Sequence, residues 1–383
     1  MESELAAIIP AAGLSSRMGE LKALLPLGQT TVLGHLIDLF HRCGIRDVIV
    51  VTGHRAGEVG QAALAAGARV VHNGDYEQGM FSSIKSGIRA LASETRGFFL
   101  LPVDIPLIRP GTIRLLAEAF TSFPLAIVYP VFQGRRGHPP LITTSLAKHI
   151  LNHDGPNGLR ALLEQVDRQS LTSVRDIAVP DANILFDMDT MADYQTGVAL
   201  YGKRDVPTLE ECSILLQDLY RMPPNGLDHA KRVAELAEAI CARIAAIRGT
   251  GPDREVCRVA GLLHDIAKGH AHHEEEGGRW LRQLGFDRAA DIVAAHKDAL
   301  LPPDGRVTEK EIVYIADKMV SGNRLVSVEK RFLEKIALYG DDPEACAAIN
   351  ARLSQAMSVM AAIEAETGTS LATIVTDMQQ EMH

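Results

Sequence analysis

The 383-residue sequence has few cysteines, no long apolar run and no excess of positive charge, and each absence narrows its class. None of its five cysteines forms a CxxC pair, which argues against a disulfide framework or a zinc ribbon and predicts a reducing compartment. No apolar run approaches the roughly 20 residues that a membrane helix needs. The net charge of −9 favours neither nucleic acid nor an acidic membrane surface as a partner. The first apolar run starts near residue 5 and leaves no room for a signal peptide, so we expect a cytoplasmic protein.

The sequence is long enough for two domains, and its two halves have different patterns. Residues 1–200 alternate apolar runs with amphipathic stretches, which is typical of a doubly wound α/β domain with a mostly parallel sheet. After a short polar linker, residues 207–383 show no strand pattern of note and predict an all-α domain. The predicted strands are 6–9, 47–52, 69–72, 98–102 and 126–130, and the predicted helices of the second half are 208–221, 228–248, 253–268, 273–284, 287–297, 308–321, 324–339 and 342–366.

A loop of small residues follows the first predicted strand. It begins with Ala11, Ala12 and Gly13, and the cations Arg17 and Lys22 come after it. Small side chains at the end of a strand let backbone N–H groups approach a phosphate, which the two cations would neutralise. The loop is not a Walker A sequence, because no Gly-Lys-Ser/Thr follows, and its glycines are too far apart for GxGxxG.

This loop resembles that of the nucleotidyltransferases which attach a nucleotide to molybdopterin or to a sugar phosphate. Its pattern A-A-G-x-S-x-R-M-G, with a lysine three residues on and then L-P-x-G, is similar to that of the molybdenum cofactor cytidylyltransferase family. The resemblance implies Mg²⁺-dependent transfer from CTP to a phosphorylated acceptor, with molybdopterin expected, a sugar phosphate as the alternative, and a molybdoenzyme or chaperone as protein partner. Guanylyl-transferring relatives tend to have A-G-G here, and the methyl group of Ala12 would crowd a purine, so we expect CTP.

Two aspartates are the magnesium ligands that this resemblance implies. Asp104 directly follows a predicted strand, where its carboxylate would bind Mg²⁺ together with phosphate oxygens. Asp189, in the sequence D-M-D-T, is expected to supply the second contact. The alternative for each is a structural one, since either aspartate could cap the helix that follows it.

Two polar stretches are expected to line the pocket under the same resemblance. Ser82 and Ser83 lie in G-M-F-S-S-I-K-S-G, which is similar to a nucleotide-binding helix start in the family. His138 lies in G-R-R-G-H-P, where Arg135 and Arg136 could also hold an anionic acceptor. The alternatives are an ordinary serine-capped helix and a basic turn in solvent.

Histidines and aspartates recur in the second half. His229 lies on the same helical stripe as Leu236 and Ile240, so it is expected to point inward. His264 and Asp265 end an apolar run, where a buried imidazole and carboxylate without partners would be costly. Convergence on a metal ion would remove that cost. The candidate ligands in chain order are His229, His264, Asp265, His273, His296 and Asp317.

This ordered set resembles the HD-domain metal-dependent phosphohydrolases, whose hallmarks are matched by L-L-H-D-I-A-K and I-A-D-K. The resemblance implies a mononuclear set of His229, His264, Asp265 and Asp317, to which His273 and His296 add the ligands of a two-metal subgroup. Mixed histidine and carboxylate ligation suits Fe, Mn or another transition metal better than Mg²⁺.

Phosphate binding in the second half is expected from Lys268, and less strongly from Arg324. His270 and His272 lie beside the candidate ligand His273 and are expected to be solvated. A different class of function remains open for this half, namely a regulatory domain that senses a nucleotide without turnover.

Overall fold

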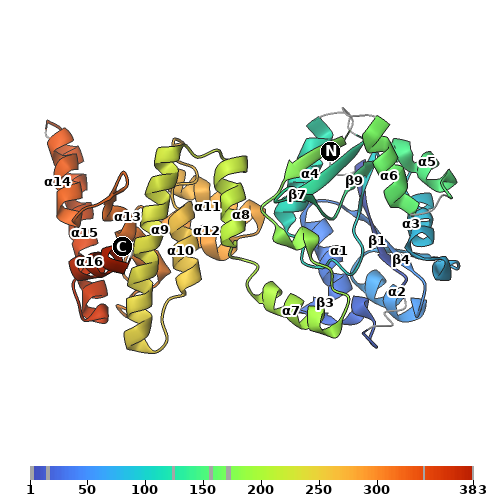
Figure 1. The fold of residues 1–383 in the computed structure, drawn as a ribbon, viewed down its shortest axis with the longest axis horizontal. Helices are drawn as coiled ribbons and strands as arrows, with labels where there is room; N and C mark the ends of the chain where they lie inside the picture. The colour runs from blue at the N-terminus through green and yellow to red at the C-terminus, as the bar shows by residue number, and fades with distance from the viewer. Residues whose placement is uncertain are drawn as a thin grey trace. The chain divides into compact units, whose positions relative to one another are not determined.

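The computed structural model describes residues 4–13, 18–122, 126–154, 158–169, 174–339 and 341–381. The chain forms two compact units, Met1–Arg204 and Asp205–His383, and each is described by itself (Figure 1). Among the described residues, no helix has both the length and the apolar character needed to cross a membrane.

A mostly parallel sheet forms the core of the first unit. Its strand order is β10-β7-β9-β6-β1-β4-β5, and β8 pairs with β7. The pairings of β9 with β6 and β7, and of β8 with β7, are antiparallel, whereas the others in this sheet are parallel. The strands are β1 (Leu5–Ala11), β4 (Asp47–Thr52), β5 (Arg69–His72), β6 (Gly97–Leu100), β7 (Ile127–Phe132), β8 (Arg135–Arg136), β9 (Leu141–Thr143) and β10 (Val174–Ala178). The predicted fold class of this half is therefore confirmed.

Helices connect the strands of this sheet and pack against it. A side chain at Gly87 of α3 would place its Cβ 2.5 Å from Ile8 Cγ2, so a glycine is needed where this helix crosses β1. Outside the sheet, β2 (Pro26–Leu27) and β3 (Thr30–Thr31) form a short hairpin. The helices are α1 (Val32–Arg42), α2 (Ala56–Ala65), α3 (Met80–Arg89), α4 (Pro110–Ser122), α5 (Ala147–Asn152), α6 (Gly158–Gln169) and α7 (Met191–Gly202).

The second unit is helical and packs around α9, which contacts α10, α13, α15 and α16. A side chain at Gly261 of α10 would place its Cβ 2.7 Å from the Cα of Ala234 on α9, so these two backbones approach closely. The elements are α8 (Leu209–Ser213), a π-helix (Ile214–Leu219), α9 (Pro224–Arg248), α10 (Arg254–Leu263), α11 (His273–Leu284), α12 (Asp287–Ala295), α13 (Glu309–Lys318), α14 (Val328–Leu338), α15 (Pro343–Thr367) and α16 (Leu371–Glu381).

Two features of this unit differ from the sequence prediction. A two-stranded hairpin of β11 (Val320–Ser321) and β12 (Arg324–Leu325) lies where the predicted helix 308–321 was expected to end and the predicted helix 324–339 to begin. Gly322 makes this turn with a φ of 60°, a conformation that glycine adopts at little cost. α10 ends at Leu263 instead of near residue 268, which leaves His264 and Asp265 just beyond the helix end.

Candidate active sites

The first candidate site lies at one edge of the sheet in the first unit. β1 and β6 are parallel neighbours, with Ile8 opposite Leu100, so their carboxyl ends meet at the same edge. The loop that starts at Ala12 and Gly13 leaves one strand there, and Asp104 follows the other. Arg17, the predicted second cation of the loop, lies outside the described residues.

Three carboxylates share this edge. The backbone N–H of Met188 donates to the backbone carbonyl of Asp104 at 2.8 Å, which brings the segment with Asp187 and Asp189 beside it. Burial raises the pKa of Asp104, nearby Lys22 opposes that rise, and the negative charges of Asp187 and Asp189 add to it. Carboxylates gathered in this way would gain from a shared cation.

Lys22 supplies a positive charge at the same place. Its Nζ donates to Asp189 Oδ1 at 2.7 Å, although the two residues are far apart in sequence. The Lys22 side chain is 12% exposed and that of Asp189 is 50% exposed, so the pair lies at the rim of the site and not in the core.

Neither aspartate is used as a helix cap in the described residues. The start of α4 is held by Asp181, whose carboxylate accepts from the backbone N–H of Arg109 and from the hydroxyl of Thr112, each at 2.8 Å. The start of α7 is held by a capping box of Thr190 and Asp193. The carboxylates of Asp104 and Asp189 are therefore not needed to cap the starts of α4 and α7.

The predicted pocket serines form a network around Asn73. Asn73 Nδ2 donates to Ser82 Oγ at 2.8 Å and to Ser83 Oγ at 2.9 Å, and Ser83 is buried. Ser82 also donates to the carbonyls of Asp75 and Gly79 and is only half-buried. This network fixes the start of α3, with Ser82 as the more accessible of the two hydroxyls.

His138 lies close enough to the carboxylates to interact with them. Burial lowers its pKa, while Asp104 and Asp187 act in the opposite direction. Its Nδ1 is buried without a hydrogen-bond partner among the described residues.

Arg136 was expected to hold an anionic acceptor, but the structure pairs it with two carboxylates of its own domain. It lies 2.6 Å from Asp167 and 2.7 Å from Asp176.

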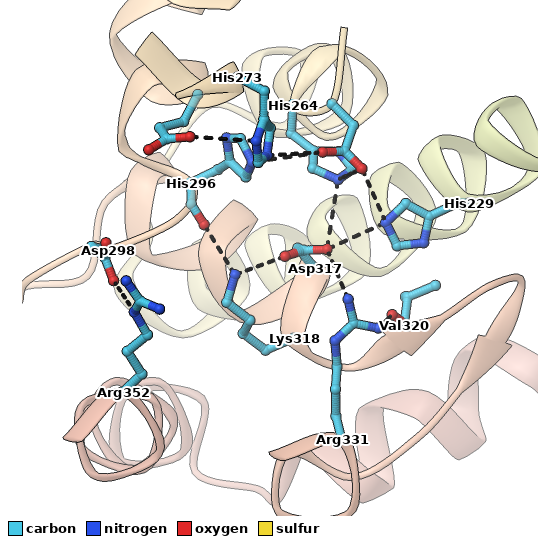
Figure 2. A network of polar contacts seen from close by, with 12 residues as sticks. His229, His264, His273, His296, Asp298, Asp317, Lys318, Val320, Arg331 and Arg352 are labelled. Atoms are coloured by element: carbon cyan, nitrogen blue, oxygen red, sulfur yellow. Dashed lines mark hydrogen bonds and ion pairs between the residues drawn. The ribbon is translucent and has the colours of Figure 1, made fainter. Parts of the chain in front are cut away.

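The second candidate site is a cluster of imidazoles and carboxylates inside the helical unit. Figure 2 shows the side chains of His229, His264, His273, His296 and Asp317 turned toward one another. They come from α9, from the segments just after α10 and α12, from the start of α11, and from α13. All six residues predicted as ligands, including Asp265, are thus brought into one cluster.

Two overlapping ligand groups share Asp265. In the first, ligand atoms of His229, His264 and Asp265 lie within 4.8 Å of one another, and in the second those of Asp265, His273 and His296 do. Asp265 Oδ1 lies 3.4 Å from His273 Nε2 and 3.8 Å from His296 Nε2, so this oxygen faces the second group. Its Oδ2 lies 3.5 Å from His264 Nε2 and faces the first.

Asp317 joins the first group. Its Oδ1 lies 3.3 Å from His229 Nε2 and 3.6 Å from His264 Nε2. Its other oxygen accepts from Lys318 Nζ at 2.8 Å, and Lys318 also donates to the backbone carbonyl of His296. Lys318 therefore orients two of the candidate ligands, a role that the sequence analysis did not assign to the lysine of I-A-D-K.

The imidazoles are held in the orientation that metal ligands require. In three of them, Nδ1 is hydrogen-bonded to a backbone carbonyl at 2.6–2.9 Å. The carbonyl of Gly322 bonds His229, that of Gly261 bonds His264, and that of Val293 bonds His296. A carbonyl at Nδ1 fixes the tautomer and leaves Nε2 as an electron-pair donor toward the centre. Nε2 of His229 and of His264 is buried and has no hydrogen-bond partner among the described residues. These donors fit one or two divalent metal ions.

The charges of the cluster are strongly coupled. Burial lowers the pKa of His264, but Asp265 and Asp317 outweigh it and raise that pKa to about 9. Burial raises the pKa of Asp317, but Lys318, His229 and His264 hold it well below its usual range. For His296, burial and the charge of His264 lower the pKa to about 4. A metal ion that binds Nε2 of His264 would therefore displace a proton, whereas Asp317 is already ionised.

A cavity of about 300 Å³ opens onto the first ligand group. Lys268 lines it, and its Nζ lies 2.5 Å from Asp265 Oδ2. Arg331 lines it as well and approaches Asp317 Oδ1 at 3.7 Å. Arg324, the weaker prediction, is exposed on β12 and is not among the lining residues, so Arg331 takes the place expected for it. His270 and His272 are exposed, as expected.

Two family models match the chain. The MobA-like NTP transferase domain matches residues 7–170, and the HD domain matches residues 226–321. The molybdenum cofactor cytidylyltransferase of Escherichia coli (strain K12) is 31% identical over 196 residues, which cover 51% of this chain and 95% of that protein. The chain belongs to the MobA-like NTP transferase family. It is a nucleotidyltransferase that also carries an HD domain.

Other relatives of this nucleotidyltransferase differ in the nucleotide that their names specify. A protein of Mycobacterium avium (strain 104) named "Probable molybdenum cofactor guanylyltransferase" is 32% identical over 197 residues, which cover 50% of this chain and 93% of that protein. Among solved structures, a nucleotidyl transferase from Methanothermobacter thermautotroptrophicus is 25% identical, with a TM-score of 0.46 and coverage of 51% of this chain and 97% of that one.

Proposed function

We propose that the first domain, residues 1–200, transfers a cytidylyl group from CTP to molybdopterin and releases pyrophosphate. The observation that carries this proposal is the grouping of Asp104, Asp187 and Asp189 with Lys22 at the carboxyl edge of β1 and β6. Its support is the relationship to an enzyme named as a molybdenum cofactor cytidylyltransferase.

The residues of this edge would act by binding and positioning. Asp104 and Asp189 would hold Mg²⁺, which offsets negative charge on the phosphates when it is bound. Lys22 would hold a phosphate oxygen of the nucleotide, with Arg17 as the second cation. Backbone N–H groups of the loop at Ala11 to Gly13 would approach the triphosphate. The acceptor phosphate is already a nucleophile, so positioning and charge neutralisation are the main requirements.

Pyrophosphate release with each of the four NTPs tests this proposal. Molybdopterin and a set of sugar 1-phosphates serve as alternative acceptors. Release with CTP and molybdopterin alone is the expected result. Release that depends on a sugar phosphate would instead assign the alternative acceptor, and release that prefers GTP would contradict the choice of nucleotide.

We propose further that residues 207–383 form a metal-dependent phosphohydrolase. The observation that carries it is the convergence of His229, His264, Asp265 and Asp317, with His273 and His296 on the second side of Asp265. These residues would hold Fe, Mn or another transition metal, which activates water for attack on phosphorus when it is bound. Lys268 and Arg331 line the cavity beside these ligands and would hold phosphate oxygens.

Metal analysis and a phosphoester panel test this second proposal. Purified protein is expected to contain one or two transition-metal ions per chain and to release phosphate from at least one nucleotide or phosphoester. After chelation, Mn²⁺ or Fe²⁺ should restore hydrolysis and Mg²⁺ alone should not. Tight metal binding without hydrolysis of any compound would contradict catalysis and favour a nucleotide-sensing domain.

A further inference from the structure

An aromatic pair lies beside the cavity of the second unit. The rings of Tyr220 and Trp280 are stacked with centroids 4.4 Å apart and planes inclined by 2°. Trp280 is held in place by a hydrogen bond from its Nε1 to Glu276 at 2.7 Å and by the edge of His270, whose ring centroid is 5.1 Å away. One face of the Tyr220 ring is therefore covered by a fixed indole.

The backbone that carries Tyr220 is unusual. It follows directly on the π-helix Ile214–Leu219, and its N–H donates to the carbonyl of Leu215 at 3.0 Å. The next residue, Arg221, has a φ of 48°, which is uncommon for a residue with a side chain. π-helical turns and such conformations occur often at functional sites. The backbone on both sides of Tyr220 thus has features that are common at functional sites.

Tyr220 lines the cavity that also reaches the candidate metal ligands. On its side the cavity is lined by Tyr220, Met222 and Pro223, and elsewhere by His229, Asp265, Lys268 and Arg331. Trp280, which covers one face of the Tyr220 ring, is not among the lining residues. One cavity therefore combines an aromatic surface with two cations and the candidate metal ligands.

We infer that this cavity binds a nucleoside 5′-monophosphate, whose base stacks on Tyr220 while its phosphate lies between Lys268, Arg331 and the ligand cluster. Every nucleobase has a flat π-face, and aromatic side chains bind it by stacking. The volume of about 300 Å³ lies at the lower end of the range for small-molecule sites, which fits a mononucleotide better than a dinucleotide.

This inference rests on the proposed phosphohydrolase function and names its substrate class. Hydrolysis would break the bond between phosphorus and the 5′ oxygen. The oxygen of water would join phosphorus, and a proton would go to the 5′ oxygen, so that the products are a nucleoside and inorganic phosphate.

Trp280 makes the test direct, because it is the only tryptophan in the chain. Its indole stacks on Tyr220, so its fluorescence reports on that ring, and the first unit contains no tryptophan. Metal-loaded protein is titrated with nucleoside 5′-monophosphates and with ribose 5-phosphate, and phosphate release from each is measured in parallel. We expect the nucleotides to change Trp280 fluorescence and to bind at least tenfold more tightly than ribose 5-phosphate.

Three variants separate stacking from other roles of Tyr220. Tyr220→Phe keeps the ring and should keep the preference for nucleotides in both binding and KM. Tyr220→Leu removes the ring and should reduce that preference by about tenfold or more. Tyr339→Leu replaces an exposed tyrosine after α14 and should behave like the unchanged protein.

The outcomes distinguish this inference from the function on which it rests. If ribose 5-phosphate binds and is hydrolysed as well as the nucleotides, or if Tyr220→Leu keeps the preference, the stacking site is wrong but the phosphohydrolase stands. If the nucleotides bind with the expected fluorescence change but no phosphoester is hydrolysed, the binding site is right and the catalytic function is wrong. If no nucleotide binds, the inference fails outright.

Discussion

At residue 12 a single methyl group is expected to influence which nucleotide the first domain takes. Ala12 follows β1 and is 6% exposed. It lies so close to Gly53 that a Cβ atom added at Gly53 would be 2.8 Å from the Cβ of Ala12. Under the proposed function, Ala12→Gly should relieve the crowding of a purine by this methyl group and raise the rate with GTP relative to CTP by about tenfold, since a hydrophobic pocket discriminates one methylene by about that factor. The ratio of kcat/KM values with the two nucleotides, measured by pyrophosphate release, checks this; an unchanged ratio would contradict it.

At residue 331 an arginine that no sequence motif marked is expected to bind the phosphate of the hydrolase substrate. Arg331→Ala should raise KM about 10- to 100-fold, because a charge-assisted hydrogen bond is worth roughly 1.5–3 kcal/mol. Arg352→Ala is the matched control, since Arg352 pairs with Asp298 at 3.2 Å and is not a lining residue of the cavity (Figure 2).

The Arg331 side chain also bonds the backbone carbonyl of Val320, so thermal unfolding is measured for both variants. Equal KM changes in the two variants would show that Arg331 does not bind the substrate. The same conclusion would follow if the KM of Arg331→Ala returned to normal under conditions that restore its thermal stability.

At the scale of elements, the contact of α9 and α10 positions the metal ligands. Gly261 allows this contact, and its carbonyl also bonds His264 Nδ1 at 2.8 Å. Gly261→Ala should push α10 away from α9, displace His264 from His229, and lower the free energy of unfolding by about 1–3 kcal/mol. Bound metal per chain should fall with it.

Gly57→Ala provides the control for this substitution. Gly57 lies in a helix of the first unit, and a Cβ there would meet nothing within 4 Å. The change should leave stability the same or raise it by up to about 1 kcal/mol, because alanine favours helices more than glycine. Full metal content and unchanged stability in Gly261→Ala would contradict the role of this contact.

The packing of α1 against α7 makes the stability of the first unit depend on pH. The His35 ring meets that of Tyr201 edge-on at 5.1 Å, and burial, followed by the charge of Arg204, lowers the pKa of His35 to about 4. Between pH 6.5 and 4 the unfolded chain therefore binds a proton that the folded chain does not. Stability is fully present above pH 6.5 and falls as the pH drops toward 4, by about 1–3 kcal/mol for this group.

Urea unfolding at pH 7 and pH 4.5 of the unchanged protein and of His35→Gln measures this effect. The variant should lose less stability over that interval, because glutamine has no proton to gain. An equal loss in both proteins would show that His35 does not contribute to the pH dependence.

The sequence predicted regular elements well where an uninterrupted apolar run marks them. β4 has the predicted bounds, because four apolar residues in a row are followed by a polar turn, and β5 has them too, although only two valines mark it. The hairpin of β11 and β12 was missed, since Gly322 and two-residue strands leave almost no periodic signal. β9 was missed as well, because three residues are too few to show a pattern.

The residues of the candidate sites likewise fall into those that the sequence predicted and those that it missed. Histidines and aspartates with metal-ligand chemistry are conspicuous in a sequence, and the structure brings all six of those in the second unit together. Arg331 and Tyr220 carry no such signal, because arginine and tyrosine are common on surfaces. Only their three-dimensional contacts with Asp317 and the cavity distinguish them.

For the whole molecule, the central claim is that two separate centres, one in each unit, perform two different phosphate reactions. Pyrophosphate release with CTP and molybdopterin, and phosphate release from the hydrolase substrate, are measured on the same preparations of Asp104→Ala and Asp265→Ala. The first variant should lose transfer at least 100-fold and keep hydrolysis, and the second should do the reverse. Loss of both activities in either folded variant, or retention of hydrolysis in Asp265→Ala, would contradict the claim.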